Sequence, residues 1–405
     1  MKWIQWMVWV GAVSVGWTQE RPDPDAMFRW MDHDGDGRIA LDETPERFRE
    51  VLRRMDRNGD GYVSREEHSA RFAQRGAPSS PPGSRRPETP PLPDSIRLEA
   101  DIPYAGTDHP RQRLDVLLPR HPNSSNLPVV VFIHGGAWMQ GDKSAGRRHL
   151  VELVASGDFV GVSIGYRLSG EAVFPAQIHD CKAAIRWVRA NASRYGCNPD
   201  KIAVWGSSAG GHLALLLGTS GAVPELEGSL GLWTNQSSRV ACVVNFFGPS
   251  QLDSMGRMSG PDSAIAHDAA DSPESRLIGG PLQEHLDKAR AASPITYVSS
   301  DDPPFLHVHG TRDRLVPFGQ AKAIHEALRA AGVPSVLITV EGGGHGQGFP
   351  PEVRALVREF LYHHLWGRPA QLQDRAVPAV SSSPASSTRR WQRSDRSDGF
   401  DLSGR

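Results

Sequence analysis

The stretch Ile202–Leu217 constrains the fold of this 405-residue chain more than any other part of the sequence. Four apolar residues with strand character run directly into Gly206-Ser-Ser-Ala-Gly210, and an apolar, helix-forming run follows. A strand that turns at once into a helix has no room for side chains two residues to either side of the apex, and glycine occupies both positions. The pattern predicts a strained turn that lifts the Ser208 hydroxyl clear of the backbone, at a helix N-terminus that favours negative charge.

The residues around this turn predict an α/β fold. Apolar, strand-like runs occur at Arg113–Leu118, Val129–Ile133, Val160–Tyr166, Ile202–Trp205, Val240–Phe247, Phe305–Val308 and Val336–Val340. Helical patterns separate them at Ala145–Ala155, Gln177–Tyr195, Ala209–Leu217, Phe318–Ala331 and Pro351–Leu365. Because the strand runs are continuously apolar rather than alternating, they indicate a mostly parallel central sheet that is buried on both faces by flanking helices.

A nucleophilic serine needs a base and an orienting acid, and in this architecture the acid and then the histidine follow the serine along the chain. Asp313 lies just past the predicted strand Phe305–Val308, and His345 lies between glycines just past the last predicted strand. We therefore predict Ser208 as the nucleophile, His345 as general base and then acid, and Asp313 as the residue that orients His345. The two histidines inside the strand, His307 and His309, are expected to be core residues.

The segment His134-Gly-Gly-Ala-Trp138 follows the predicted strand Val129–Ile133. Its glycines let backbone N–H groups approach a substrate oxygen, whereas the simpler interpretation is an ordinary tight turn. We predict an oxyanion hole formed by the N–H of Gly136, by Gly135 or Ala137, and by the N–H of Ala209 after the nucleophile.

With these residues in hand, the region from about Leu98 to Trp366 resembles the α/β-hydrolase superfamily. More narrowly, it is similar to secreted carboxylesterases of the hormone-sensitive-lipase and acetylxylan/feruloyl esterase type. The motifs that carry the resemblance are His134-Gly-Gly-Ala-Trp138, Asp142, Tyr166-Arg-Leu168, Asp180-Cys-Lys-Ala-Ala-Ile-Arg-Trp187, Gly206-Ser-Ser-Ala-Gly-Gly211 and His309-Gly-Thr-Arg-Asp313. The resemblance implies framework roles for Tyr166, Arg167 and Asp180, and a cap inserted at about residues 252–292 that shapes the substrate pocket.

Two twelve-residue loops near the N-terminus carry acidic residues at the spacing of calcium ligands, and they resemble the EF-hand family. The predicted ligands are Asp32, Asp34, Asp36, Arg38 and Glu43 in the first loop and Asp56, Asn58, Asp60, Tyr62 and Glu67 in the second, with Arg38 and Tyr62 contributing backbone carbonyls. Ile39 and Val63 are expected to pair across the loops. Since the loops begin only 24 residues apart, one helix must connect them, which favours a structural or docking module with two Ca²⁺ sites over an opening sensor.

The composition divides the chain into five segments. Residues 1–19 read as a signal peptide whose apolar core is too short to span a bilayer comfortably, with an uncleaved anchor as the alternative. The EF-hand pair spans residues 20–75, a Pro/Ser-rich linker 76–95, the hydrolase domain 96–367 and a disordered tail 368–405. The three cysteines are expected to be core thiols, and the net charge of −1 gives no electrostatic case for nucleic acid.

These observations together predict an exported serine carboxylesterase, secreted, periplasmic or at the cell surface, that forms an acyl-enzyme. The resemblance implies small acyl esters as substrates, such as acetyl or feruloyl groups on polysaccharides, and ester chemistry that needs no cofactor. One alternative is an amide or peptide hydrolase of the same fold. Another is a calcium-dependent docking protein whose hydrolase fold is inert. Apart from the ester, expected partners are calcium and a protein docked through the EF-hand module, with no stable membrane span.

Overall fold

The computed structural model describes residues 92–380 and, nearer the N-terminus, residues 38–40, 53, 55, 56, 60–64 and 67. The chain divides into two compact units, Met1–Pro90 and Pro91–Arg405, which are considered separately. The predicted signal peptide, most of the predicted linker and residues 381–405 lie outside the described residues. None of the helices described is long and apolar enough to cross a membrane.

The first unit contains a two-stranded sheet that joins the two calcium-type loops. Strand β1 (Arg38–Ala40) pairs antiparallel with β2 (Tyr62–Ser64), and Ile39 lies opposite Val63. Both side chains are completely buried, which confirms the predicted pairing across the loops.

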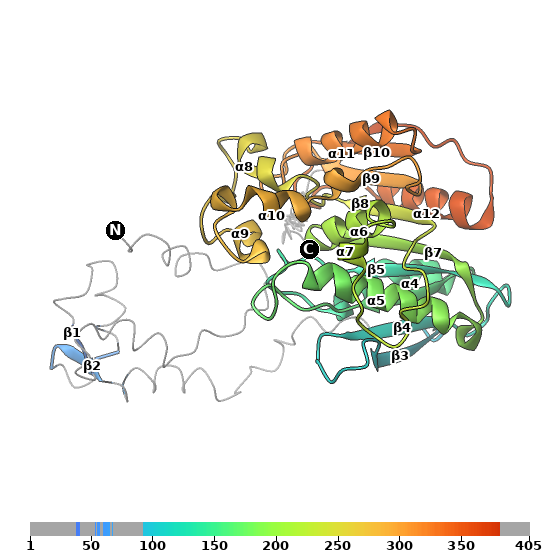
Figure 1. Ribbon diagram of the computed structural model, residues 1–405, viewed down its shortest axis with the longest axis horizontal. Helices are drawn as coiled ribbons and strands as arrows, with labels where there is room; N and C mark the ends of the chain where they lie inside the picture. The colour runs from blue at the N-terminus through green and yellow to red at the C-terminus, as the bar shows by residue number, and fades with distance from the viewer. Residues whose placement is uncertain are drawn as a thin grey trace, which may run out of the picture. The chain divides into compact units, whose positions relative to one another are not determined.

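The second unit is built on a nine-stranded sheet in the order β11-β10-β9-β8-β7-β5-β6-β4-β3 (Figure 1). Its strands are β3 (Ile96–Pro103), β4 (Arg113–Pro119), β5 (Leu127–Ile133), β6 (Val160–Ile164), β7 (Cys197–Ser207), β8 (Cys242–Phe246), β9 (Phe305–Gly310), β10 (Ser335–Glu341) and β11 (Arg375–Pro378). In this order, each strand from β11 across to β6 is parallel to the next. Only β4 runs antiparallel to its neighbours, β6 and β3. This is the mostly parallel α/β-hydrolase sheet that the sequence predicts.

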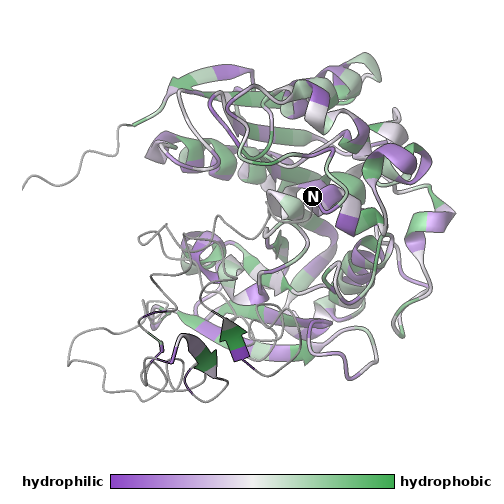
Figure 2. Ribbon diagram, turned by 90° about the vertical axis from the view of Figure 1, so that its left-hand side faces the viewer, coloured by the Kyte–Doolittle hydropathy of each residue, from purple (hydrophilic) through white to green (hydrophobic). Residues whose placement is uncertain are grey.

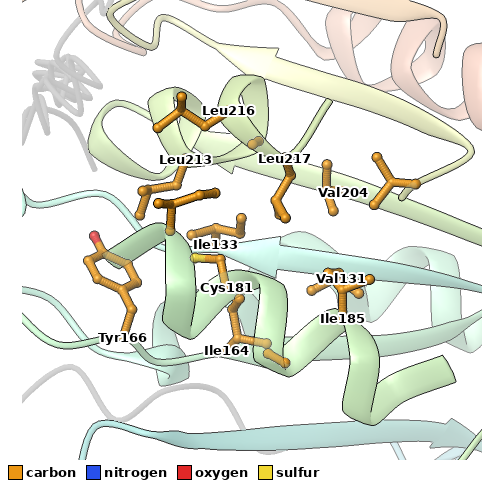
Figure 3. Packing of buried hydrophobic residues seen from close by; sticks show 14 of the residues in the cluster. Val131, Ile133, Ile164, Tyr166, Cys181, Ile185, Val204, Leu213, Leu216 and Leu217 are labelled. Carbon is orange, nitrogen blue, oxygen red and sulfur yellow. The ribbon is translucent and has the colours of Figure 1, made fainter. Parts of the chain in front are cut away.

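Helices cover both faces of the sheet, because the sheet residues are apolar on both sides. On one face lie α5 (Ala176–Ala190), α6 (Ala209–Thr219) and α11 (Gly319–Ala330), and on the other lie α4 (Arg147–Ala155) and α12 (Pro351–Trp366). Every residue of β5 is buried, and successive residues alternate between the two hydrophobic cores. In Figure 2 the sheet strands are accordingly coloured largely as hydrophobic. Figure 3 shows residues of the core between the sheet and helices α5, α6 and α11. Among them are Val131, Ile133, Cys181, Ile185, Val204, Leu213, Leu216 and Leu217.

The resemblance implies framework roles for Tyr166, Arg167 and Asp180. The hydrogen bonds between Arg167 and Asp180 agree with such a role. Asp180, whose side chain is fully buried, accepts hydrogen bonds from the Arg167 backbone N–H (2.8 Å) and from the Arg167 guanidinium (2.7 Å). A third bond comes from Gln112 (2.8 Å). A buried carboxylate is stable only when it is paired and hydrogen-bonded, and Asp180 on α5 meets both conditions while contacting the β6–α5 loop and the residue before β4.

Three segments differ from the prediction. The helix predicted at Gln177–Tyr195 ends at Ala190, and residues Ala192–Tyr195 form a separate 3₁₀ turn that closes at Gly196, whose φ is 64°. The edge strand β3 was not predicted. The third difference is β11, which lies inside the segment predicted to be a disordered tail yet pairs with residues Ile338–Glu341 of β10. Only Val377 in β11 is buried, so the strand has too little apolar pattern to be recognised before its partner is known.

The segment expected to form a cap is an insertion of short helices between β8 and β9. These are η4 (Leu252–Ser254), α8 (Met255–Met258), α9 (Pro273–Ile278), η5 (Leu282–Glu284), α10 (Leu286–Ala291) and η6 (Pro294–Tyr297). Figure 1 shows α8, α9 and α10 grouped together, beside the face of the sheet that α6 and α11 cover. The buried amide of Gln320 on α11 fixes the start of the insertion, because its oxygen accepts the N–H groups of Ser250 (2.8 Å) and Gln251 (2.7 Å).

Buried histidines make the stability of this unit sensitive to acid. Burial lowers the pKa of His134 and His212 to about 4 and that of His149 and His307 to about 3. An unfolded histidine takes up a proton near pH 6.5, so the stabilisation is complete above that pH and is lost as the pH falls toward the folded pKa. Each fully buried histidine then contributes on the order of 1–2 kcal/mol of destabilisation at about pH 5.

We predict that the melting temperature of this unit falls steeply when the pH is lowered from about 7 to about 5 at constant ionic strength. His307→Gln keeps the acceptor that faces Asn245 but removes a titrating group, so its melting temperature falls less over the same range. The exposed His121→Gln serves as the control and follows the wild type. An equal fall in His307→Gln and the wild type would contradict the prediction.

Candidate active site

The turn around Ser208 has the strained conformation that its glycines predict. Ser208 has a φ of 55° and a ψ of −125°, and its N–H donates to the carbonyl of Phe246 at 2.9 Å. A Cβ on Gly206 would lie 2.0 Å from the carbonyl oxygen of Gly210, and a Cβ on Gly210 would lie 2.1 Å from the carbonyl oxygen of Ile133. Because real Cβ atoms do not approach backbone so closely, only glycine fits at either position.

The predicted acid and base are in direct contact. Asp313 Oδ2 lies 2.7 Å from His345 Nδ1, so the carboxylate accepts a hydrogen bond from the Nδ1–H group and leaves Nε2 available as the base. The other oxygen, Oδ1, accepts the N–H groups of Leu315 (2.8 Å) and Val316 (2.9 Å). The carboxylate is fully buried, whereas the His345 side chain is 15% exposed.

The electrostatics keep the acid ionised. Burial alone would raise the pKa of Asp313, but hydrogen bonds from His309 and His345 outweigh it and hold the pKa well below its usual range. Asp313 is thus a carboxylate at any pH at which a histidine can act as a base. The ring of Phe247 packs against the His345 ring, with 4.3 Å between centroids, and limits the positions that the imidazole can take.

His309 has a place in this site that the strand pattern did not reveal. Its Nε2 lies 2.9 Å from the carbonyl oxygen of Val316 and 3.2 Å from Asp313 Oδ2, so the N–H of this second imidazole faces the same carboxylate oxygen as His345. We predicted it as a core residue, and it is indeed fully buried. The available signal was its position four residues before Asp313, but burial within β9 hid the contact. His309 is therefore a positioning residue for Asp313.

The predicted oxyanion-hole segment lies against the nucleophile. A Cβ on Gly135 would be 3.1 Å from Ser208 Cβ, which places the glycine beside the serine. Gly136 has a φ of 118°. Within the part of the chain that the structure describes, the N–H groups of Gly135, Gly136 and Ala209 have no acceptor, so they can serve a substrate oxygen.

A buried histidine connects this segment to the rest of the site. Trp138 Nε1 donates to His212 Nδ1 at 3.2 Å, and His212 Nε2 lies 2.6 Å from the carbonyl oxygen of Ala292. Those partners assign a neutral ring with its proton on Nε2, in agreement with the lowered pKa of His212. The ring therefore links the oxyanion segment, helix α6 and the end of the insertion.

The strand topology explains why these groups meet. Strands β5, β7, β8, β9 and β10 are parallel neighbours, so their carboxyl ends share one edge of the sheet. Gly135, Ser208, Phe247, Asp313 and His345 each follow one of these ends within a few residues. The structure thus brings the predicted oxyanion segment beside the nucleophile and the acid beside the base, all at one edge.

The predicted calcium ligands are described only in part. Asp32, Asp34, Asp36, Glu43 and Asn58 lie outside the described residues, as does the helix expected between the two loops. In the second loop, Asp56 accepts the N–H of Gly61 (3.0 Å), Asp60 accepts the N–H of Tyr62 (2.9 Å), and Glu67 accepts the N–H of Ser64 (3.0 Å). Those described residues include no group of three potential ligand side chains close enough to hold a metal. The oxygen donors folded onto the loop nevertheless suit a hard cation such as Ca²⁺.

Comparison with known proteins adds relatives for both units. Residues 48–67 match the EF-hand family. Esterase LipC of Mycobacterium tuberculosis is 34% identical over 240 residues, which cover 59% of this chain and 58% of LipC. The chain spans about half the length of the curated relatives it matches.

Solved structures resemble the second unit. A truncated carbohydrate esterase from gut microbiota superposes with a TM-score of 0.62 at 33% identity, over 67% of this chain and 96% of that protein. A bifunctional GH43-CE protein of Bacteroides eggerthii superposes with a TM-score of 0.61 at 38% identity, over 66% of this chain and 35% of that one. The BD-FAE family matches residues 114–328, more than half of the chain. The protein therefore belongs to the BD-FAE family and has the α/β-hydrolase fold.

Proposed function

We propose that this protein is a serine carboxylesterase that hydrolyses esters of small acyl groups through an acyl-enzyme. The observation that carries the proposal is the buried Asp313–His345 pair at the same sheet edge as Ser208, whose strained turn lies against Gly135. Its relatives among curated proteins and solved structures are named as esterases, which supports ester rather than amide chemistry.

The proposed reaction has two steps. His345 Nε2 takes the proton of Ser208 Oγ while Oγ forms a bond to the ester carbonyl carbon, and the N–H groups of Gly135, Gly136 and Ala209 stabilise the resulting oxyanion. His345 then gives the proton to the alcohol oxygen as the carbon–oxygen bond breaks, which leaves an acyl-serine and a free alcohol. Water repeats the sequence, with His345 again as base and then acid, and releases the carboxylic acid.

The proposed substrates are acetyl or feruloyl esters of polysaccharides. The name "carbohydrate esterase" of one structural relative, and the pairing of GH43 with CE in the name of the other, support this class. Export is part of the proposal, since residues 1–19 have the charged start and apolar core of a signal peptide and a polysaccharide substrate lies outside the cell.

We also propose that the N-terminal unit binds two calcium ions. Besides the EF-hand match, the support is the folding of the Asp56, Asp60 and Glu67 carboxylates onto the second loop. The other donors would be Asp32, Asp34, Asp36, Glu43 and Asn58, with the carbonyl oxygens of Arg38 and Tyr62. Bound calcium would neutralise the carboxylates of the two loops and hold the loops around the buried Ile39–Val63 pair, as a structural or docking module.

The first test is hydrolysis of p-nitrophenyl acetate by the full chain and by Ser208→Ala. Removal of the nucleophile is expected to lower kcat by roughly 10³-fold or more. A denatured sample quenched early in the wild-type reaction should contain protein heavier by one acetyl group, and the variant should not. Ser193→Ala, which changes an exposed serine away from the site, is the control and should match the wild type. Unchanged turnover in Ser208→Ala would overturn the serine mechanism.

Asp313→Asn tests the role of the acid. The amide cannot hold the His345 proton on Nδ1, so kcat/KM at neutral pH is expected to fall by about 10⁴-fold. Because the Asp313 pKa lies well below its usual range, the carboxylate is ionised throughout mildly acidic and neutral pH. Protonation of Asp313 should therefore make no contribution to the wild-type kcat/KM profile in that range. A loss smaller than tenfold in the variant would argue against this assignment.

Calcium binding is tested by titration calorimetry of the full chain after removal of metal by a chelator. Two ions per chain are expected, and Glu67→Gln should lose one of them, because the last loop position supplies two oxygens to the ion. Glu66→Gln is a matched control, since it removes the same charge from the neighbouring position. Equal binding by the two variants would contradict the ligand assignment.

A further inference from the structure

A cleft of about 710 Å³ opens beside the predicted base. It lies between α4 and the N-terminal half of α12, over the carboxyl ends of β7 and β8. His345 and Ser207, the residue before the nucleophile, both line its wall. The cleft is therefore continuous with the candidate active site and lies on the His345 side of it.

The inner wall of the cleft is aromatic. Trp205 and Phe246 form part of it, with 5.3 Å between their rings, and Phe247 and Phe349 form another part, with 5.7 Å between theirs. Trp205 is only 5% exposed, yet its indole Nε1–H has no acceptor among the residues that the structure describes. A buried donor without a partner is uncommon in proteins, so this wall has an apolar surface together with a hydrogen-bond donor to be satisfied.

The rim of the cleft is cationic. Arg148, Arg354 and Arg358 line it, with Glu152 as the acidic residue among its lining side chains. Glu152 is already paired with Arg354 at 3.2 Å. Arg148 and Arg358 have no carboxylate partner within the described part of the chain, and the contact of Arg148 is with the neutral ring of His149 (3.2 Å). Two guanidinium groups thus remain available to an anionic ligand, and their planar forks match a carboxylate.

The position of the cleft determines which part of an ester it would hold. In the proposed reaction, His345 protonates the departing alcohol oxygen, so the alcohol part of the ester must lie on the His345 side. The oxyanion donors contributed by Gly135 and Gly136 belong to the other side of the carbonyl group. A ligand that extends from the reacting carbon past His345 would enter the cleft between α4 and α12.

We propose that this cleft binds the alcohol part of the substrate and selects alcohols that carry a carboxylate on a ring, as an acidic sugar of a polysaccharide does. The proposal rests on the proposed esterase function and makes its substrate class more specific. The ring would contact the aromatic wall formed by Trp205, Phe246 and Phe349, while Arg148 and Arg358 bind the carboxylate at the rim. The indole N–H of Trp205 would donate to an oxygen of the ligand.

The test uses acetyl esters whose alcohol parts differ in charge. 4-Acetoxybenzoate and the longer 4-acetoxycinnamate each release a phenol that carries a carboxylate, and 4-acetoxybenzamide and 4-acetoxycinnamamide are their neutral counterparts. The readout is the ratio of kcat/KM for the charged ester to that for its neutral counterpart. Because intrinsic reactivities differ, this preference is compared between enzymes rather than between esters. Both alcohol lengths are measured to allow for the distance between the reacting carbon and the rim.

In Arg358→Gln we expect the preference for the charged ester of at least one length to fall by about threefold to tenfold, as for loss of one partly exposed charge-assisted hydrogen bond. Arg148→Gln should act in the same direction, and the double variant should lose more. Added salt should reduce the preference in the wild type, because these charges are near solvent. Arg329→Gln, which removes the same charge from α11 on the other face of the sheet, is the control and should keep the wild-type preference.

The two proposals fail in different ways. If all four esters are hydrolysed but Arg358→Gln and the double variant keep the wild-type preference at both lengths, the cleft proposal is overturned and the esterase proposal stands. If none of the esters is hydrolysed by the wild type, the esterase proposal fails, and with it the assignment of the cleft to an alcohol.

Discussion

The active-site edge depends on the close approach of three backbone segments at the end of the central sheet. Helix α6 begins so near the end of β5 that Gly210 lies against the carbonyl oxygen of Ile133, and Gly206 lies against that of Gly210. No side chain fits between these segments, and the turn between them forces Ser208 into a positive φ. This strain is maintained by the buried core on both faces of the sheet, because relieving it would separate α6 from β5 and β7. The same approach brings Gly135 against the nucleophile.

The surroundings of each titratable group at this edge determine whether the group is ionised or neutral. Asp313 receives hydrogen bonds from two backbone N–H groups and faces two imidazoles, so it remains a carboxylate despite complete burial. His212 is buried, has no charged partner among the residues that the structure describes and is neutral, which lets it accept from Trp138 and donate to the carbonyl of Ala292. One network therefore orients the base, while the other fixes the oxyanion segment against the insertion. Each depends on groups that are far apart in the sequence.

The second unit combines a general catalytic edge with a particular cleft. The groups proposed to break the ester come from loops after β5, β7, β9 and β10, which the parallel sheet places together whatever the substrate is. The aromatic wall and the arginines next to it come from α4, from α12 and the loop before it, and from the carboxyl ends of β7 and β8. His345 and Phe247 belong to both, so the proposed cleft directly adjoins the catalytic edge. The paired loops of the first unit have a core of their own, centred on Ile39 and Val63.

The sequence by itself determined the class of fold and the positions of Ser208, Asp313 and His345, because each depends on local chemistry: continuous apolar strands, glycines around a serine, and polar residues just past strand ends. It also predicted the Ile39–Val63 pair from the repeat of the two loops. It did not reveal β11, whose single buried valine has meaning only beside β10, or the contact of His309 with Asp313, which looks like an ordinary core position in β9. The cleft between α4 and α12 was also beyond sequence reasoning, since Arg148, Trp205 and Arg358 come together only when the sheet is folded. Local patterns record which element a residue joins, whereas the neighbours of that residue across elements are set by how the sheet and helices pack.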